Sequence, residues 1–140
     1  MQNVGLLVLA RSHPDVFEEI ELRSRAAEQG YVELERRILG FDHADVGGIL
    51  LQRWGLASSL VSAVASHHRL PPSGEDRVFA AIVAVSEDLA LRLGEGPTET
   101  RDDDLSDTEA ARALGLDTVT LQEVADELAT RTLDQELFGA

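Results

Sequence analysis

The sequence predicts an all-α fold, a compact bundle of about six to eight helices. Apolar residues recur every three to four positions along most of the chain, and no stretch shows the strict alternation of a strand. The composition, 44% hydrophobic and 27% charged, is typical of a folded chain, and 140 residues suit one domain spanning 1–140. With four Phe, one Tyr and one Trp, the core must be largely aliphatic.

The first half of the chain predicts four helices. The apolar run 4–10 does not by itself distinguish helix from strand, and the helical patterns after it favour helix. Pro14 fits a first helical turn, and the apolar spacing continues to Gly30. A shorter helix is expected over 31–39, and another runs from the N-cap Asp42 to Gly55.

The helix after Asp42 carries two features that predict its packing. Gly47 and Gly48 are poor helix formers, so their presence indicates that another backbone packs closely there. The spacing of the larger apolar residues predicts a buried stripe of Val46, Ile49, Leu50 and Trp54.

The second half predicts a short helix ended by Pro71 and a long helix from about Glu75 to Leu93, capped by Ser73. Residues 95–107 are acidic and rich in Thr, Gly and Pro, and we expect a mobile, exposed loop there. The long helix has a predicted buried stripe of Val78, Phe79, Ile82, Val85, Leu89 and Leu93. Two short C-terminal helices are expected to start at the capping boxes Ser106/Glu109 and Thr120/Glu123.

The charge balance argues against two classes of partner, although Arg23, Arg25, Arg36 and Arg37 could still form a local basic patch or a solvated helix face. Twelve basic and 26 acidic side chains give a net charge of −14, which repels nucleic acids and anionic membrane surfaces. No cysteine is present, so disulfides, thiolate nucleophiles and cysteine-based zinc sites are excluded. The early apolar run 4–10 is too short to span a bilayer and has no basic leader. We therefore expect a cytoplasmic protein.

The chemistry-bearing residues are histidines, because the common nucleophile, phosphate-loop and dinucleotide motifs are missing. His43, His67 and His68 could ligate a metal from neighbouring helices. Alternatively, His67 and His68 cap the negative end of a helix and His43 lies at the surface of a first turn. The carboxylates available to a metal are Glu35, Asp42, Asp45 and Glu87, each of which could equally be a cap or a solvated charge.

Two segments resemble a known family. Residues 35–56 read ERRILGFDHADVGGILLQRWGL, and residues 64–68 read VASHH. This combination of a Glu, an Asp-His pair, a Val-Gly, a Trp-Gly-Leu and paired histidines is similar to the bacterial HDOD signalling domain, a divergent branch of the HD and HD-GYP phosphohydrolases. Weaker similarity covers residues 2–128, and the chain looks like the C-terminal half of that domain, so the resemblance implies a partial HD-like helical fold.

The resemblance also implies that this chain has lost metal ligands that its metal-binding relatives carry. Metal-binding relatives carry a His-Asp pair where this chain has Gln2 and Asn3, and amides are poor ligands for a transition metal. Glu87 stands where the relatives have an aspartate, and the Gly-Tyr-Pro motif is absent. The resemblance therefore implies vestigial metal ligands at His43, His67, His68 and Glu87. We expect no cofactor. The alternative is that the chain binds a divalent transition metal.

Three functional hypotheses follow. The leading one is a non-catalytic signal-transduction or scaffold module that binds a protein partner or self-associates, covering a helical face that further HDOD helices would otherwise cover. The second is a metal-dependent phosphohydrolase or phosphodiesterase, which needs ligands that this chain does not visibly supply. The third is a nucleotide sensor, with Arg53, Arg69 and the histidines as phosphate donors.

Overall fold

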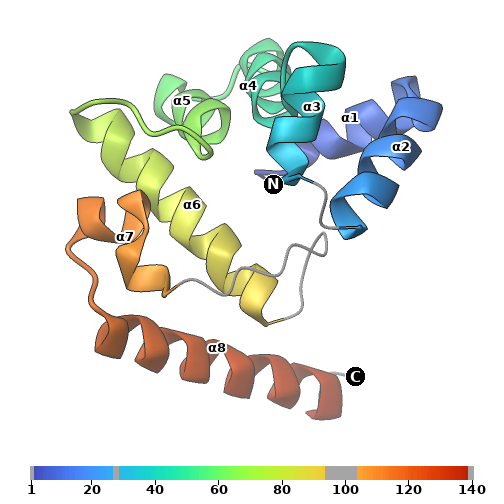
Figure 1. Cartoon of the computed structure of the whole chain (residues 1–140). Helices are drawn as coiled ribbons and strands as arrows, with labels where there is room; N and C mark the ends of the chain where they lie inside the picture. Colours follow the sequence, from blue (N-terminus) through green and yellow to red (C-terminus); the bar gives the residue numbers. More distant parts are fainter. Residues whose placement is uncertain (1, 27–28, 94–103, 139–140) are drawn as a thin grey trace.

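The computed structural model describes residues 2–26, 29–93 and 104–138, and side chains up to residue 130. Within these ranges the chain forms eight α-helices, one short 3-10 helix and no strand, which confirms the predicted all-α bundle (Figure 1). No helix of this described part is both long and apolar enough to cross a membrane.

Most helices lie close to their predicted positions. The elements are α1 (Val4–Ser12), α2 (Pro14–Arg25), α3 (Tyr31–Leu39), α4 (His43–Arg53), α5 (Ser58–Ser66), α6 (Glu75–Arg92), η1 (Leu105–Asp107), α7 (Glu109–Leu114) and α8 (Thr118–Phe138). The helix after Pro14 ends at Arg25, earlier than the predicted Gly30. The last helix, with 21 residues, is not short as expected.

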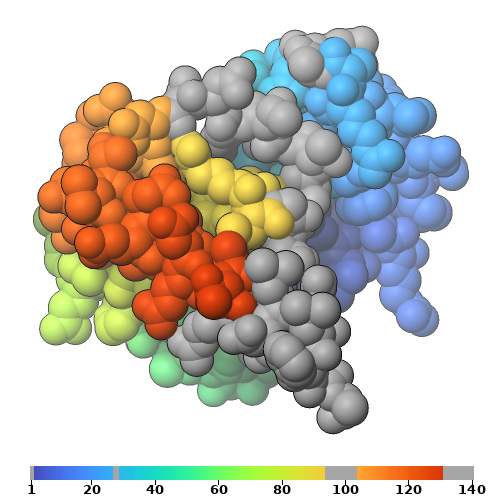
Figure 2. All heavy atoms as spheres, turned by 90° about the horizontal axis from the view of Figure 1, so that it is seen from below, coloured from blue at the N-terminus to red at the C-terminus, as the bar shows by residue number. Residues whose placement is uncertain are grey.

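The helices form two groups that meet along α6. Helices α1 to α4 gather at one end, α5 packs between α4 and α6, and α7 packs against the other side of α6 (Figure 1). Helix α8 runs below α6 and α7. Seen from below, the side chains of α7 and α8 cover one side of the molecule, and those of α1 and α2 lie on the other (Figure 2).

Glycines bring α1, α4 and α5 into close contact, as Gly47 and Gly48 predicted. A Cβ on Gly48 would lie 2.7 Å from Cβ of Ala65 in α5, and one on Gly47 would lie 3.0 Å from Cγ1 of Val64. The tightest approach is at Gly5 of α1, where a Cβ would lie 1.9 Å from the carbonyl oxygen of His43. Helix α1 can therefore meet the start of α4 only through a glycine.

The predicted buried stripe of α4 is wrong for its two bulkiest members. Ile49 is 57% exposed and Trp54 is 60% exposed, whereas Ala44 and Leu51 are buried. Because α1 and α5 pack against the glycine side of α4, the two glycines face these helices, and Ile49 and Trp54 are left exposed.

The stripe predicted for α6 is wrong in the same way at its N-terminal end. Val78, Phe79 and Ile82 are between 44% and 46% exposed, while Ala80 and Ala81 are fully buried. Leu93 is also 36% exposed, and only Val85 and Leu89 of the predicted stripe are buried. Alanines let the neighbouring helices approach closely, and the larger side chains are left outside.

The caps are partly as predicted. Asp42 caps α4 in a full capping box with Asp45. Ser73 does not cap α6, because Gly74 precedes its first residue. The two predicted C-terminal capping boxes are wrong as well: Thr108 caps α7, and the carboxylate of Asp117 accepts from the amide of Thr120, which lies inside α8.

Two hydrophobic clusters hold the bundle together. The larger lies between α6, η1, α7 and α8, and its buried members are Ala81, Val85, Leu89, Leu105, Ala110, Ala111 and Leu121. The smaller joins α2 and α3 through Ile20, Tyr31 and Leu34. Of the predicted mobile loop 95–107, residues 95–103 lie outside the described residues, and Leu105 is 5% exposed, so that part of the loop prediction is wrong.

Candidate functional site

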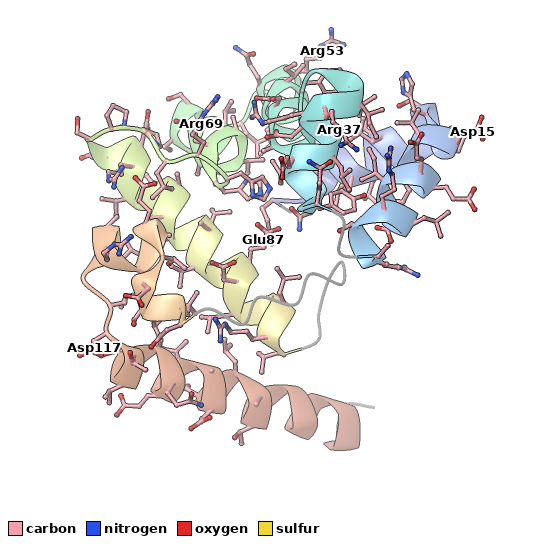
Figure 3. The ribbon with its side chains drawn as sticks, viewed as in Figure 1. Asp15, Arg37, Arg53, Arg69, Glu87 and Asp117 are labelled. Carbon is pink, nitrogen blue, oxygen red and sulfur yellow. The ribbon has the colours of Figure 1, made fainter. Side chains whose placement is uncertain are left out.

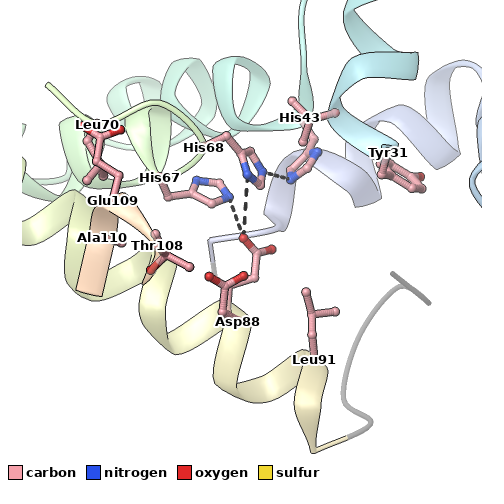
Figure 4. Close-up of a pocket in the computed structure, with 13 residues that line it drawn as sticks. Tyr31, His43, His67, His68, Leu70, Asp88, Leu91, Thr108, Glu109 and Ala110 are labelled. Atoms are coloured by element: carbon pink, nitrogen blue, oxygen red, sulfur yellow. Dashed lines mark hydrogen bonds and ion pairs between the residues drawn. The ribbon is translucent and has the colours of Figure 1, made fainter. Parts of the chain in front are cut away.

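The fold brings together the four residues singled out as metal ligands. His43 is the first residue of α4, His67 and His68 follow the end of α5, and Glu87 lies on α6 (Figures 3 and 4). One ligand atom from each lies within 4.8 Å of the others. Bonds to zinc are about 2.0–2.2 Å long, so ligands that share one ion lie about 4 Å apart or less. Binding of one ion would therefore require these atoms to move closer together.

His43 is held by a buried carboxylate. Its side chain is 4% exposed, which excludes the alternative of a surface position in a first turn. The backbone amide and Nδ1 of His43 both donate to Oε2 of Glu35, at 3.1 and 2.7 Å. A carboxylate at neutral pH only accepts, so Nδ1 carries the hydrogen and Nε2 of the neutral ring presents its lone pair.

His67 is oriented by its own helix. Its Nδ1 donates to the carbonyl oxygen of Val64 at 2.6 Å, which leaves the Nε2 lone pair directed towards Glu87. Burial lowers the pKa of His67 below its usual value, although the charge of Glu87 and the bond to Val64 act in the opposite direction. The ring is therefore neutral at neutral pH.

His68 completes a contact between imidazoles. Its Nε2 lies 2.9 Å from Nε2 of His43, and its Nδ1 lies 3.9 Å from Oε2 of Glu87 (Figure 4). If the His43 ring is neutral, its Nε2 accepts there, and either His68 donates the hydrogen of that contact or a cation lies between the two nitrogens.

Glu87 is shared between the histidines and an amide. Nδ2 of Asn3 donates to Oε1 of Glu87 at 2.8 Å, joining residues 84 positions apart. The other oxygen, Oε2, lies 3.4 Å from Nε2 of His67. Both of these atoms are acceptors, and Nε2 of His67 is buried with no hydrogen-bond partner. Two facing acceptors repel each other unless a proton or a metal ion lies between them.

The other candidate carboxylates have structural roles. Asp42 is buried and accepts from Arg36 at 2.6 and 3.0 Å. Burial alone would raise the pKa of Asp42, but hydrogen bonds from the Asp45 amide and from Arg36 outweigh it and hold that pKa below its usual value. Asp45 closes the capping box, so neither aspartate turns towards the histidines.

A cavity of about 160 Å³ opens beside the cluster. Besides the four candidate ligands, its lining includes Tyr31, Leu70, Asp88, Leu91 and Thr108 (Figure 4). No arginine is among the described lining residues. Arg53 and Arg69 are exposed and do not line this cavity (Figure 3). The prediction that they would donate to a phosphate beside the histidines is therefore wrong.

Comparison with protein families settles the relationship. The model of the HDOD domain matches residues 1–70, half of the chain. The chain belongs to the HDOD family.

A curated protein is also similar to this chain. An uncharacterized protein of Treponema pallidum (strain Nichols) is 25% identical over 100 residues, which cover 70% of this chain and 19% of that protein. The chain thus spans less than a fifth of that relative's length. No solved structure matches the chain significantly.

The HDOD match contains the three histidines and Glu35 but ends before Glu87. The sequence pointed to all four candidate ligands by their residue types, and the resemblance added that they are remnants of a metal site. It gave no signal for the cavity residues Asp88 and Thr108, which come from the helices beyond the match.

Proposed function

We propose that this chain is a non-catalytic HDOD signalling module that acts by binding a protein, either a partner or a second copy of itself. The observation that carries the proposal is the hydrogen bond from Asn3 to Glu87. An amide stands where the resemblance places an aspartate in metal-dependent relatives. It occupies one oxygen of the only carboxylate in the cluster and adds no negative charge.

Hydrolysis on two metal ions needs more ligands than this cluster offers. Two-metal sites hold their ions about 3.5–4 Å apart, and each ion needs its own set of ligands. The described cluster supplies three imidazoles and one carboxylate, which suit a single ion. The residue set therefore supports signalling without phosphoester hydrolysis.

Exposed apolar side chains support a protein-binding role. Val78, Phe79 and Ile82 lie at neighbouring positions of α6, and each is about half exposed. Trp54, the single tryptophan, is also mostly exposed. Contiguous exposed apolar surface marks protein interaction sites, so we place the binding surface on this side of α6.

Activity assays test the non-catalytic part. Protein exchanged into Mn, Fe or Zn is expected to show no turnover of phosphomonoesters, phosphodiesters or cyclic dinucleotides. Turnover that disappears in His67→Leu would overturn the proposal. The double variant Gln2→His/Asn3→Asp, which restores the lost pair, is the matched test of whether those two amides are the cause.

Cross-linking tests the binding surface. A photo-reactive side chain at position 79 is expected to capture a protein in cells, whether another protein or a second copy. The same group at position 22, where Leu22 is 62% exposed on α2, is the control for exposure alone. Equal capture at both positions, or none at position 79, contradicts a binding surface on α6.

A second candidate function is the binding of one divalent transition-metal ion by His43, His67, His68 and Glu87. It is favoured by the facing acceptors, Nε2 of His67 and Oε2 of Glu87. A bound ion would satisfy both atoms and act as a Lewis acid towards a bound ligand. Elemental analysis after metal exchange is expected to find one ion per chain in the wild type and none in His67→Leu.

A further inference from the structure

We propose that Glu35 is a positioning residue that fixes the tautomer of His43, so that His43 presents its Nε2 lone pair to a cation at the histidine cluster. The inference rests on the second candidate function, metal binding, for its purpose. Its structural part, the tautomer, stands on geometry alone.

The geometry lets a single oxygen atom set the orientation of a whole residue. Oε2 of Glu35 accepts from both the backbone amide and Nδ1 of His43. The two bonds fix the ring relative to its own backbone and place the hydrogen on Nδ1. The opposite nitrogen, Nε2, is the one that meets His68 at 2.9 Å. A carboxylate behind a ligating histidine, bonded to its distal nitrogen, is the usual support for a metal-binding imidazole.

A role in stability alone does not explain this glutamate. Glu35 is 0% exposed, and its second oxygen, Oε1, is buried without a hydrogen-bond partner. A buried carboxylate with one unsatisfied oxygen costs folding free energy, which a leucine of similar size would not. Positive charge beside the His43 ring would offset that cost, and a metal ion bound at the histidine cluster would supply it.

The next residue of α3 takes the structural role instead. Arg36 binds Asp42, the N-cap of α4, so consecutive residues of α3 hold consecutive residues at the start of α4. The bond to Asp42 secures the helix start, and Glu35 orients the ring of His43. Substitution of Glu35 therefore leaves the connection between α3 and α4 in place.

Imidazole nitrogen resonances provide the direct test. Long-range proton–nitrogen correlation spectra of metal-free wild type, at about pH 8 where imidazoles are neutral, are expected to show His43 with its hydrogen on Nδ1. Glu35→Leu is expected to move that hydrogen to Nε2. Glu35→Gln is expected to keep it on Nδ1, since one carbonyl oxygen can accept both hydrogens. Assignment uses the spectrum of His43→Gln.

Zinc titration by calorimetry measures the consequence for binding. Loss of this support is expected to weaken zinc binding about 10–100-fold in Glu35→Leu, with a smaller loss in Glu35→Gln, which removes only the charge. Glu33→Gln is the matched control, because Glu33 is an exposed carboxylate on the same helix that accepts from Nε2 of Gln29. It is expected to bind zinc like the wild type.

The outcomes separate the two proposals. A wild-type His43 with its hydrogen on Nε2 overturns the positioning role, as does a Glu35→Leu variant with unchanged tautomer and affinity. If the wild type shows the predicted tautomer but binds no zinc, metal binding is overturned. The orientation of His43 by Glu35 then still holds. If circular dichroism shows that Glu35→Leu is unfolded, the wild-type tautomer and the zinc affinity of Glu35→Gln decide.

Discussion

Helix α6 contributes to two buried regions of opposite chemistry. Ala81, Val85 and Leu89 pack into the aliphatic cluster with α7 and α8, where every buried member is apolar. Glu87 enters the histidine cluster on the side of α4 and α5. The same helix therefore supports a region that stabilises the fold and a region built from groups that are costly to bury.

The two regions differ in their buried polar atoms, because the histidine region contains several that have no hydrogen-bond partner. In the histidine region, the buried atoms without a hydrogen-bond partner include Oδ1 of Asn3, Oε1 of Glu35 and Nε2 of His67. Each such atom costs about 1–3 kcal/mol. Stability does not account for this arrangement, whereas the proposed cation would satisfy Nε2 of His67. Substitutions in the two regions should accordingly have different costs.

The largest expected effect comes from Gly5→Ala. A methyl group there would overlap the carbonyl oxygen of His43, a backbone atom that cannot rotate away. We expect a loss of about 4 kcal/mol or more of unfolding free energy, measured by urea denaturation. Leu7→Ala on the same helix, where Leu7 is 72% exposed, is the control. An unchanged urea midpoint in Gly5→Ala would contradict the contact between α1 and α4.

In the aliphatic region, Leu89→Ala should be the next most costly change. Leu89 is 6% exposed and packs within the cluster, so its truncation removes buried apolar surface and leaves a cavity. We expect a loss of about 2–5 kcal/mol by urea denaturation. Leu128→Ala, at a 38% exposed position on α8, should cost clearly less. Equal losses of unfolding free energy in both variants would show that the aliphatic cluster is not the main source of stability around α6, α7 and α8.

Asp42→Asn should cost about 1–3 kcal/mol at pH 7, because it removes a charged hydrogen bond to Arg36 at a buried position. The pKa of Asp42 is lowered in the fold, so its contribution is complete above the ordinary value of 3.8 and is lost as the pH falls below it. The gap between wild type and variant should therefore narrow from pH 7 to pH 3. A constant gap would show that the loss is not electrostatic.

The smallest change is expected for His67→Leu in metal-free protein at pH 7, within about 1 kcal/mol of the wild type. Leucine loses the bond to Val64 but removes a buried nitrogen that has no partner. Because burial lowers the pKa of His67, the unfolded chain takes up the proton first, and the wild type loses stability as the pH falls below 6.5. The variant should lack that part of the pH dependence. A large loss at pH 7 would mean that the histidine region also supports the fold.

Sequence patterns predicted where helices lie better than which side of them is buried. Helix α3 was predicted at both ends, because glycines flank it and Gly40 adopts the left-handed conformation, with φ of 82°. The packed sides of α4 and α6 were missed, because glycines and alanines, rather than the bulkiest residues, make the helix contacts there. Hydrophobic spacing gives most weight to large residues and cannot detect such contacts.

The sequence predicted which residues form the candidate site but not how their side chains are oriented. The paired histidines and His43 were singled out as possible ligands from the sequence itself, and the replacement at Asn3 was found through the resemblance. The orientation of each ring was not, because it depends on the carbonyl of Val64 and on Glu35. The bond from Asn3 to Glu87 joins residues far apart in sequence, and no local pattern encodes it.

The shared bonds around the histidine cluster have a mechanical consequence. A cation held there would connect α4, α5 and α6 directly, α3 through Glu35, and the start of α1 through Asn3. It would act as a reversible cross-link across more than half of the chain, limiting the openings that expose its backbone amides. Amide hydrogen exchange in these five helices should then slow together when metal is added, while α8, which does not contribute to the cluster, keeps its own rate.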